Sequence, residues 1–295
     1  MINGIGLGLL SYALFSTSDA TTKGLGPSLS VFEILFFLTL FSFLTFPFAK
    51  PAEESWRDAF SIKRPGLVAV RSLSGVLSSV FVVYSFTTLP LAEAYSLIFL
   101  MPAFVTILSI PILGEQVGWR RWLAVALGFA GVLLVVRPGF RELHLGHLSA
   151  IVGAALSAVS MIALRMAGQS EKRISLLTAL YVTGLVVDGA LMLFSFRWPG
   201  PRELGLAAIG GIFGGAGNTL ILAATRLAPA NRVAPMQYSQ ILWAVVFGAV
   251  FFGDTPDLLA GVGMVLVAAS GFLTFIREET LHGWSRRTFL MRNRP

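Results

Sequence analysis

Ionisable side chains inside the apolar stretches of this 295-residue chain are few, and they are the first candidates for chemistry. Asp19 and Lys23 lie four residues apart, so on a helix they share one face and can pair. Glu33 and Glu93 stand near the ends of two further apolar stretches. If these ends meet, the four side chains form a gate or a cluster that responds to protons. The alternative is a set of ion pairs that only holds helix ends together.

Asp188 is a single carboxyl group inside an apolar stretch, with no ionisable side chain close to it in the sequence. Removal from water favours the neutral form of such a carboxyl, which can then take up and release protons. The sequence therefore predicts a coupling group at Asp188. The alternative is a buried carboxyl that hydrogen-bonds to a helix rich in small residues.

Uncharged polar side chains are the better candidates for binding an uncharged or zwitterionic molecule. Asn218, Gln237, Tyr238 and Gln240 offer hydrogen-bond donors and acceptors. Gln237 and Gln240 are three residues apart and share a helix face. Pro235 removes one backbone hydrogen bond just before them and can open the helix towards a cavity. We expect a substrate-binding site here, with hydrogen bonding between helices as the alternative.

Aromatic rings in the apolar stretches can present flat surfaces to a planar ligand. Tyr84 and Phe99 are the rings that we place with Tyr238 in the predicted binding site. Packing between helices is the alternative role of any one of these rings.

The composition indicates that most of the chain lies in lipid. Hydrophobic residues make up 55% of it and charged residues 13%, and the mean hydropathy is +0.78. Soluble domains carry about 25% charged residues. The composition thus excludes a soluble enzyme, a nucleic-acid-binding domain and a disulfide-linked secreted domain.

Side chains suited to catalysis or to metal binding are scarce. The chain has no Cys, and its three His lie outside the predicted spans or at their ends. We expect His144 and His147 to form a solvated turn. The sequence therefore predicts no catalytic residues, no metal site and no cofactor.

A helix of about 20 apolar residues crosses the hydrocarbon core of a bilayer. The apolar runs between charged or Gly- and Pro-rich breaks predict ten such helices, and hence an all-α integral membrane protein. The predicted spans are 4–23, 30–49, 67–88, 91–113, 118–136, 147–165, 175–196, 203–225, 230–252 and 256–276.

Basic residues predict the orientation of these spans. With a cytoplasmic N-terminus, 17 of the 22 Lys and Arg residues fall on the inner side and five on the outer side. The outer five are Lys23, Arg137, Arg141, Arg197 and Arg202. The positive-inside rule then places both termini in the cytoplasm.

The two halves of the chain share a pattern. Gly114-Glu115 ends the fourth predicted span and Gly253-Asp254 ends the ninth. Five spans per half is an odd number, so the second copy must enter the membrane from the opposite side. We predict five-helix repeats over 1–140 and 141–277, followed by a basic cytoplasmic tail over 278–295. Inverted repeats are typical of secondary transporters that work by alternating access.

With these features the chain resembles the drug/metabolite transporter superfamily, in its EamA-type branch of ten-helix transporters. Pro102 with Gly114-Glu115-Gln116 and the later Gly253-Asp254 carry this resemblance. A closer likeness to bacterial riboflavin importers and S-adenosylmethionine uptake carriers rests on short motifs. They are Ser18-Asp19-Ala20 with Lys23, Glu33 with Phe36-Phe37, Arg71, Gly118-Trp119-Arg120-Arg121-Trp122 and Pro235-Met236-Gln237-Tyr238-Ser239-Gln240. Leu38 departs from a related pattern, which has an arginine after the paired Phe.

The resemblance implies a secondary transporter in a bacterial inner membrane rather than an enzyme. Few charges and many aromatic rings favour a planar, mostly uncharged substrate, so riboflavin uptake is our first expectation. The alternatives are uptake of S-adenosylmethionine, for which Asp19 or Asp188 would supply a carboxylate, and export of amino acids or amphiphilic metabolites. The expected partners are a small-molecule substrate and the lipid bilayer, and no nucleic acid. A homodimer is left open.

Overall fold

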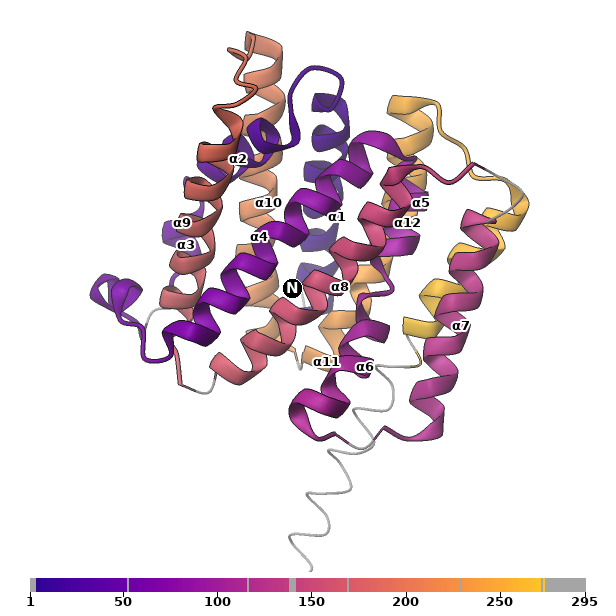
Figure 1. Cartoon of the computed structure of the whole chain (residues 1–295), viewed down its shortest axis with the longest axis horizontal. Coiled ribbons are helices and arrows are strands. Elements are labelled where there is room, and N and C mark those ends of the chain that lie inside the picture. The colour runs from indigo at the N-terminus through magenta and orange to yellow at the C-terminus, as the bar shows by residue number, and fades with distance from the viewer. Residues whose placement is uncertain are drawn as a thin grey trace, which may run out of the picture.

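The computed structural model of the chain describes residues 4–51, 53–115, 117–137, 142–168, 170–228, 230–271 and 273 (Figure 1). Within these ranges every regular element is a helix and no strand occurs. The prediction of an all-helical chain is therefore confirmed for this part of the molecule. Gln116 and the predicted tail lie outside the described residues.

The described residues of the first half of the chain form eight helical elements in succession. They are α1 (Gly4–Leu25), α2 (Val31–Ser42), α3 (Phe46–Ala49), the 3-10 helix η1 (Trp56–Phe60), α4 (Pro65–Thr88), α5 (Leu91–Ile98), α6 (Met101–Leu113) and α7 (Trp119–Val136).

The second half contains long helices first and a broken run later. Its elements are α8 (Leu145–Ala167), α9 (Arg173–Met192), α10 (Pro201–Leu227), α11 (Ala230–Val233), the 3-10 helix η2 (Ala234–Tyr238), α12 (Ser239–Phe247), the π-helical turn η3 (Gly248–Phe252) and a last helix, Leu258–Gly271.

Six helical runs among the described residues are long and apolar enough to cross a membrane. They are Pro65–Thr88, Leu91–Leu113, Leu145–Ala167, Arg173–Met192, Pro201–Leu227 and Pro235–Phe252. Helix α1 has comparable length, 22 residues, but is more polar because it carries Ser, Thr, Asp and Lys side chains. Two of these polar side chains of α1, Asp19 and Lys23, belong to the polar contacts described in the next subsection.

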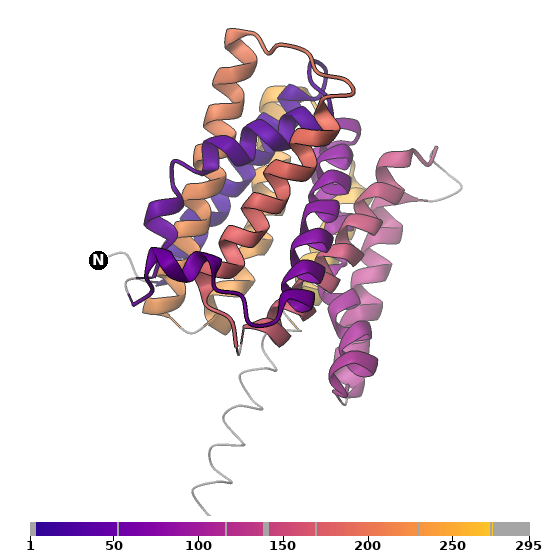
Figure 2. The same ribbon diagram turned by 60° about the vertical axis from the view of Figure 1, so that its left-hand side comes forward.

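Two closely packed helix pairs form the centre of the bundle. Helix α1 packs along α10, and α4 packs along α8 (Figures 1 and 2). Small residues permit this contact: Ser11 Oγ donates to Gly217 O at 2.7 Å, and Ser78 Oγ donates to Gly153 O at 2.8 Å. Small residues at helix interfaces in membranes let backbones approach closely.

Helix α7 stands at the edge of the bundle and packs against the last helix (Figure 1). Gly131 and Gly263 meet in this contact. A Cβ on Gly131 would lie 2.6 Å from Gly263 O, and one on Gly263 would lie 2.5 Å from Gly131 O. Both positions therefore require glycine.

The runs 91–113 and 230–252 are interrupted, as the prolines in them predict. Helix α5 ends at Ile98 and α6 begins at Met101, with Pro102 in its first turn. Pro235 lies in the 3-10 helix η2, just before α12. Proline in a helix interior removes a backbone hydrogen bond. The interruptions bring polar and aromatic side chains of α5, η2 and α12 into the centre of the bundle.

Candidate functional site

A line of polar side chains joins three helices inside the bundle. The Tyr95 hydroxyl on α5 donates a hydrogen bond to Asp19 Oδ2 on α1. Gln240 Nε2 on α12 donates to the Tyr95 hydroxyl oxygen at 3.0 Å. Tyr95 is buried, with 3% of its surface exposed. We refer to Asp19, Tyr95 and Gln240 as the central polar site.

Aromatic rings extend from this site along one side. The Tyr95 ring centroid lies 5.3 Å from that of Phe86 and 5.6 Å from that of Phe99. Phe99 and Tyr238 follow with centroids 5.1 Å apart. The structure therefore brings together four of the predicted residues, namely Asp19, Gln240, Phe99 and Tyr238.

Tyr95 is the member of the site that sequence reasoning missed. A tyrosine in an apolar stretch carries a hydroxyl that must find a partner when it is buried. That requirement was the available signal, and Asp19 on another helix meets it.

The chemistry of this arrangement suits a ligand with a positive charge and a flat ring. Asp19 can place a negative charge at the Tyr95 hydroxyl, and a cation over an aromatic face such as that of Tyr95 or Phe99 is attracted by the ring. Gln240 adds an amide with both donors and an acceptor.

Lys23 does not pair with Asp19, although their spacing along α1 allows it. Lys23 Nζ lies 2.8 Å from Asp254 Oδ2 and donates to Leu89 O at 2.7 Å. It also lies 5.1 Å from the centroid of the Phe252 ring. The groups that bind Lys23 come from other parts of the chain, and spacing along α1 says nothing about them.

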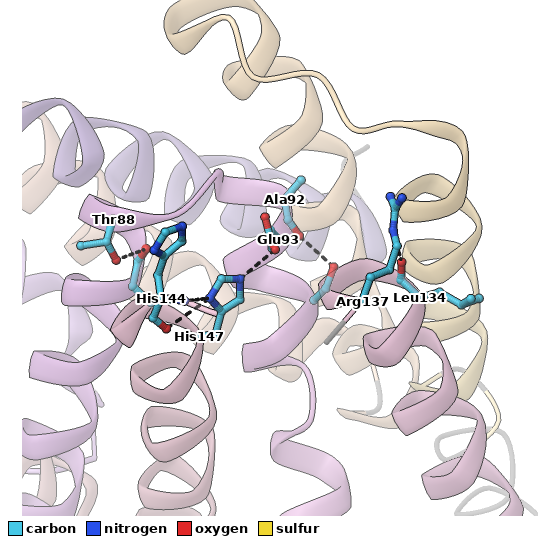
Figure 3. A network of polar contacts seen from close by, with 9 residues as sticks. Thr88, Ala92, Glu93, Leu134, Arg137, His144 and His147 are labelled. Carbon is cyan, nitrogen blue, oxygen red and sulfur yellow. Dashed lines mark hydrogen bonds and ion pairs between the residues drawn. The ribbon is translucent and has the colours of Figure 1, made fainter. Parts of the chain in front are cut away.

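Glu93 in the first turn of α5 pairs with His147 in the first turn of α8 (Figure 3). His147 Nε2 lies 2.9 Å from Glu93 Oε1, and the backbone N–H of His144 donates to His147 Nδ1 at 3.0 Å. His147 Nδ1 also lies 3.2 Å from the backbone oxygen of His144, so both ring nitrogens are engaged in polar contacts. His147 is only 6% exposed and lies in the first turn of α8, so the expected solvated turn is wrong for His147, whereas His144 is exposed.

A cavity of about 310 Å³ opens beside Glu93. Arg137 at the end of α7 pairs with Asp257 on its rim. The lining residues are Pro90, Ala92, Glu93, Val135, Ala244, Gly253, Asp254, Thr255, Pro256, Asp257, Ala260 and Met264. The Lys23–Asp254 pair therefore borders this cavity on one side. Lys23 lies on α1, as does Asp19 of the central polar site.

Glu33 and Asp188 both lie buried away from the central polar site. Glu33 Oε2 accepts from the backbone N–H of Ser30 at 2.8 Å, and Oε1 accepts from that of Arg197 at 2.6 Å. Glu33 thus caps α2 and binds the segment before α10. This agrees with the alternative role given above, in which the side chain holds helix ends together. Asp188 is 2% exposed on α9, and its Oδ1 has no hydrogen-bond partner among the described residues.

The remaining predicted binding residues do not all converge. Gln237 lies in η2 next to Tyr238. Asn218 lies on an exposed face of α10, where Nδ2 donates to Gly214 O at 3.2 Å. Tyr84 lines an apolar groove between α4 and α8 with Phe81, Leu148 and others, and so does not join Phe99 and Tyr238. The structure therefore does not bring Asn218 and Tyr84 together with the other predicted binding residues.

Comparison with known proteins decides the family. The family model described as the EamA-like transporter family matches residues 2–137 and again 144–276. The chain belongs to the EamA-like transporter family. The resemblance seen in the sequence is thereby confirmed.

Relatives of this EamA-like chain include transporters of known name. The S-adenosylmethionine uptake transporters of Rickettsia prowazekii and Rickettsia conorii are 25% and 26% identical to it over 282 residues. These alignments cover 95% and 94% of both chains, respectively. The pseudopaline exporter of Pseudomonas aeruginosa is 24% identical and covers 91% of this chain and 94% of its own.

A solved crystal structure shares the fold. It superposes with a TM-score of 0.66 at 16% identity, over 94% of this chain and 98% of that chain. The family, the bacterial relatives and the long apolar helices show that this chain is a multi-pass protein of the bacterial inner membrane.

Proposed function

We propose that this protein is a secondary transporter that carries S-adenosylmethionine into the cell by alternating access. The observation that carries the proposal is the Asp19 carboxyl at the hydroxyl of Tyr95, whose ring lies next to that of Phe99. S-adenosylmethionine has a sulfonium cation, an ammonium group and a flat adenine ring. Carboxylate and aromatic faces are the groups that attract such cations.

The names of the relatives support the same substrate. Uptake transporters for S-adenosylmethionine align with nearly the whole of this chain. Riboflavin has no fixed positive charge to match Asp19. The S-adenosylmethionine alternative is therefore better supported than our first expectation.

The topology that we propose is ten spans in two inverted repeats, 1–140 and 141–277, with both termini in the cytoplasm. The family model matches once in each half. The helix contacts also agree with a two-fold exchange of spans. Such an exchange puts the sixth span in the place of the first and the third span in the place of the eighth. The contact of the first span with the eighth (α1 with α10) is matched accordingly by the contact of the sixth span with the third (α8 with α4).

Equivalent turns end the fourth and ninth spans. Gly114 has φ 68° and Gly253 has φ 71°, both in the left-handed region that glycine adopts without strain. Each caps the helical run before it. This shared geometry supports the repeat that Gly114-Glu115 and Gly253-Asp254 predict.

The central polar site draws side chains from both proposed repeats, Asp19 and Tyr95 from the first and Gln240 from the second. A site between inverted repeats is exposed to one side and then to the other when the repeats rock against each other. We assign the Lys23–Asp254 pair as a gate on the outer side, because Lys23 is one turn of α1 beyond Asp19 and Asp254 belongs to the second repeat.

Uptake by intact cells tests this function. Cells that lack their own carrier, with and without this gene, are given labelled S-adenosylmethionine. The proposal predicts saturable uptake that unlabelled S-adenosylmethionine blocks and riboflavin does not. Saturable uptake of riboflavin, or none of S-adenosylmethionine despite membrane expression, would contradict it.

A further inference from the structure

Asp188 is a buried titratable group that the central polar site does not use. It lies on α9 with 2% of its surface exposed, and its Oδ1 has no hydrogen-bond partner in the described part of the chain. Asp188 Oδ2, a Val76 methyl on α4 and the Thr39 methyl on α2 all lie within 3.8 to 4.0 Å of the place where a Cβ on Gly184 would be. The carboxyl therefore faces the seam where α9 meets α2 and α4.

This seam is closely packed around the carboxyl. Gly189 directly follows Asp188, and a Cβ on Gly189 would lie only 3.2 Å from the Phe36 ring of α2. Two glycines on α9 thus let α2 approach on either side of Asp188. Water has little room beside the carboxyl as long as α2 and α9 stay in contact.

The charged groups on the surrounding elements are engaged elsewhere. On α2, Glu33 is held by Ser30 and the Arg197 amide. On α4, Arg71 Nη1 donates to Leu176 O, which is twelve residues and about 18 Å along α9 from Asp188.

Beyond the end of α9, Arg197 pairs with Glu203 at 3.2 Å. Further titratable groups near α9 lie towards its first half. Arg173 begins the helix, and Tyr181 packs on the rings of Phe43 and Phe46. In η1, Asp58 pairs with Lys172, and Arg57 stands beside it in the same short helix. Within the described ranges no ion pair reaches Asp188.

An ionised carboxylate without a partner is strongly destabilised in such a seam. The neutral acid is therefore the form that fits the packed seam, and the charged form fits a seam that water has entered. Proton binding and seam packing are then linked, since each favours the other.

We propose that Asp188 binds the proton that couples transport, holding it while α2 and α9 are packed and releasing it when they separate. This rests on the proposed function, because α2 and α9 belong to opposite repeats and move apart only if the repeats rock. One proton taken from the outer solution leaves to the cytoplasm with each substrate molecule imported.

Purified protein in liposomes separates coupling from substrate movement. The first measurement is exchange of labelled external for unlabelled internal S-adenosylmethionine without a pH gradient. The second is net accumulation driven by an interior more alkaline by one pH unit. Asp188→Asn keeps the shape of the side chain and cannot titrate, and Asp58→Asn is the matched control on the surface.

With the membrane potential held at zero, the wild type and Asp58→Asn are expected to exchange and to accumulate substrate about tenfold in response to the gradient, as one proton per substrate allows. Asp188→Asn is expected to exchange within about twofold of wild type and to lose the gradient-driven accumulation. Gradient-driven accumulation by Asp188→Asn, or its absence in the wild type, would overturn the proposal.

Infrared spectroscopy keeps the inference testable if the substrate is wrong. If no form of the protein exchanges S-adenosylmethionine, the proposed function fails, and the carboxyl is judged by its own C=O band. A protonated carboxyl band at neutral pH that disappears in Asp188→Asn, and not in Asp58→Asn, supports a proton held at Asp188. If the band is the same in Asp188→Asn, Asp188 does not hold the proton.

Discussion

Tyr95 is the residue on which the geometry of the central polar site depends. Its hydroxyl donates to Asp19 and accepts from Gln240, so it links two helices that are remote in sequence. A hydrogen bond to a charged group contributes about 1.5–3 kcal/mol. The ring itself packs between Phe86 and Phe99 and does not need the hydroxyl.

Tyr95→Phe is therefore expected to weaken S-adenosylmethionine binding about tenfold or more and to leave the fold intact. The measurement is the substrate concentration that gives half-maximal uptake. Tyr84→Phe is the matched control, since Tyr84 lines the apolar groove between α4 and α8. Equal behaviour of Tyr95→Phe and wild type would show that the Tyr95–Asp19 hydrogen bond does not contribute to binding.

At this scale the sequence identifies residue types better than partners. Asp19 and Gln240 stand out in the sequence because polar side chains inside a membrane are energetically costly and usually have a function. The partner of Lys23 is Asp254, 231 residues away, and a rule for residues four apart cannot reveal it. Burial of His147 likewise depends on Glu93, which approaches from a different helix.

The Lys23–Asp254 contact is a link between elements, from α1 to the turn after η3. Its loss is expected to favour opening on that side of the molecule. The chain has no Cys, so a single Cys at Ser16 on the same helix can report access from outside. Lys23→Gln and Asp254→Asn should each increase its labelling by an impermeant thiol reagent several-fold.

The double reversal Lys23→Asp with Asp254→Lys should bring labelling back towards that of the parent, because it restores opposite charges. Labelling that is unchanged in the single variants would show that this pair does not close the path.

The start of α9 depends on an ion pair that responds to pH. Lys172 Nζ lies 2.8 Å from Asp58 Oδ2, and the Ser55 amide donates to the same oxygen. Chiefly the Lys172 ammonium, and then this amide, lower the pKa of Asp58 below its ordinary value. The pair therefore stabilises the fold above the ordinary pKa of an aspartate, and its contribution disappears as the pH falls through the lowered value.

We accordingly expect Asp58→Asn to melt at a slightly lower temperature than wild type at neutral pH and at the same temperature in acid. The difference is small because the pair is partly exposed. Thermal unfolding in detergent at several pH values measures it. A difference that grows towards acid pH would contradict this interpretation.

The sequence predicts individual helices well where an apolar run is unbroken. Helix α4 covers 65–88 against a predicted 67–88, and α10 covers 201–227 against 203–225. The run 30–49 instead divides into α2 and α3, with residues 43–45 between them. Local hydrogen bonding, such as that of Thr45 Oγ1 to Ser42 O, decides such breaks, and an average over a hydropathy window does not detect it.

For the whole molecule, family and substrate are predictable to different degrees. Paired Gly-acid turns and the count of apolar runs point to an EamA-type transporter, and the family model agrees over both halves. The low content of charge pointed to riboflavin, because composition averages over all helices. A single carboxylate such as Asp19, placed among rings, changes which ligand fits, and its placement depends on the fold.

The most direct test of the central claim is exchange by the purified protein in liposomes loaded with unlabelled S-adenosylmethionine. We predict that labelled S-adenosylmethionine enters these liposomes and fails to enter empty ones. Asp19→Asn should lower the rate about tenfold or more, because it removes the charge that attracts the sulfonium. Exchange of riboflavin with no exchange of S-adenosylmethionine, or full activity in Asp19→Asn, would contradict the proposed substrate and its site.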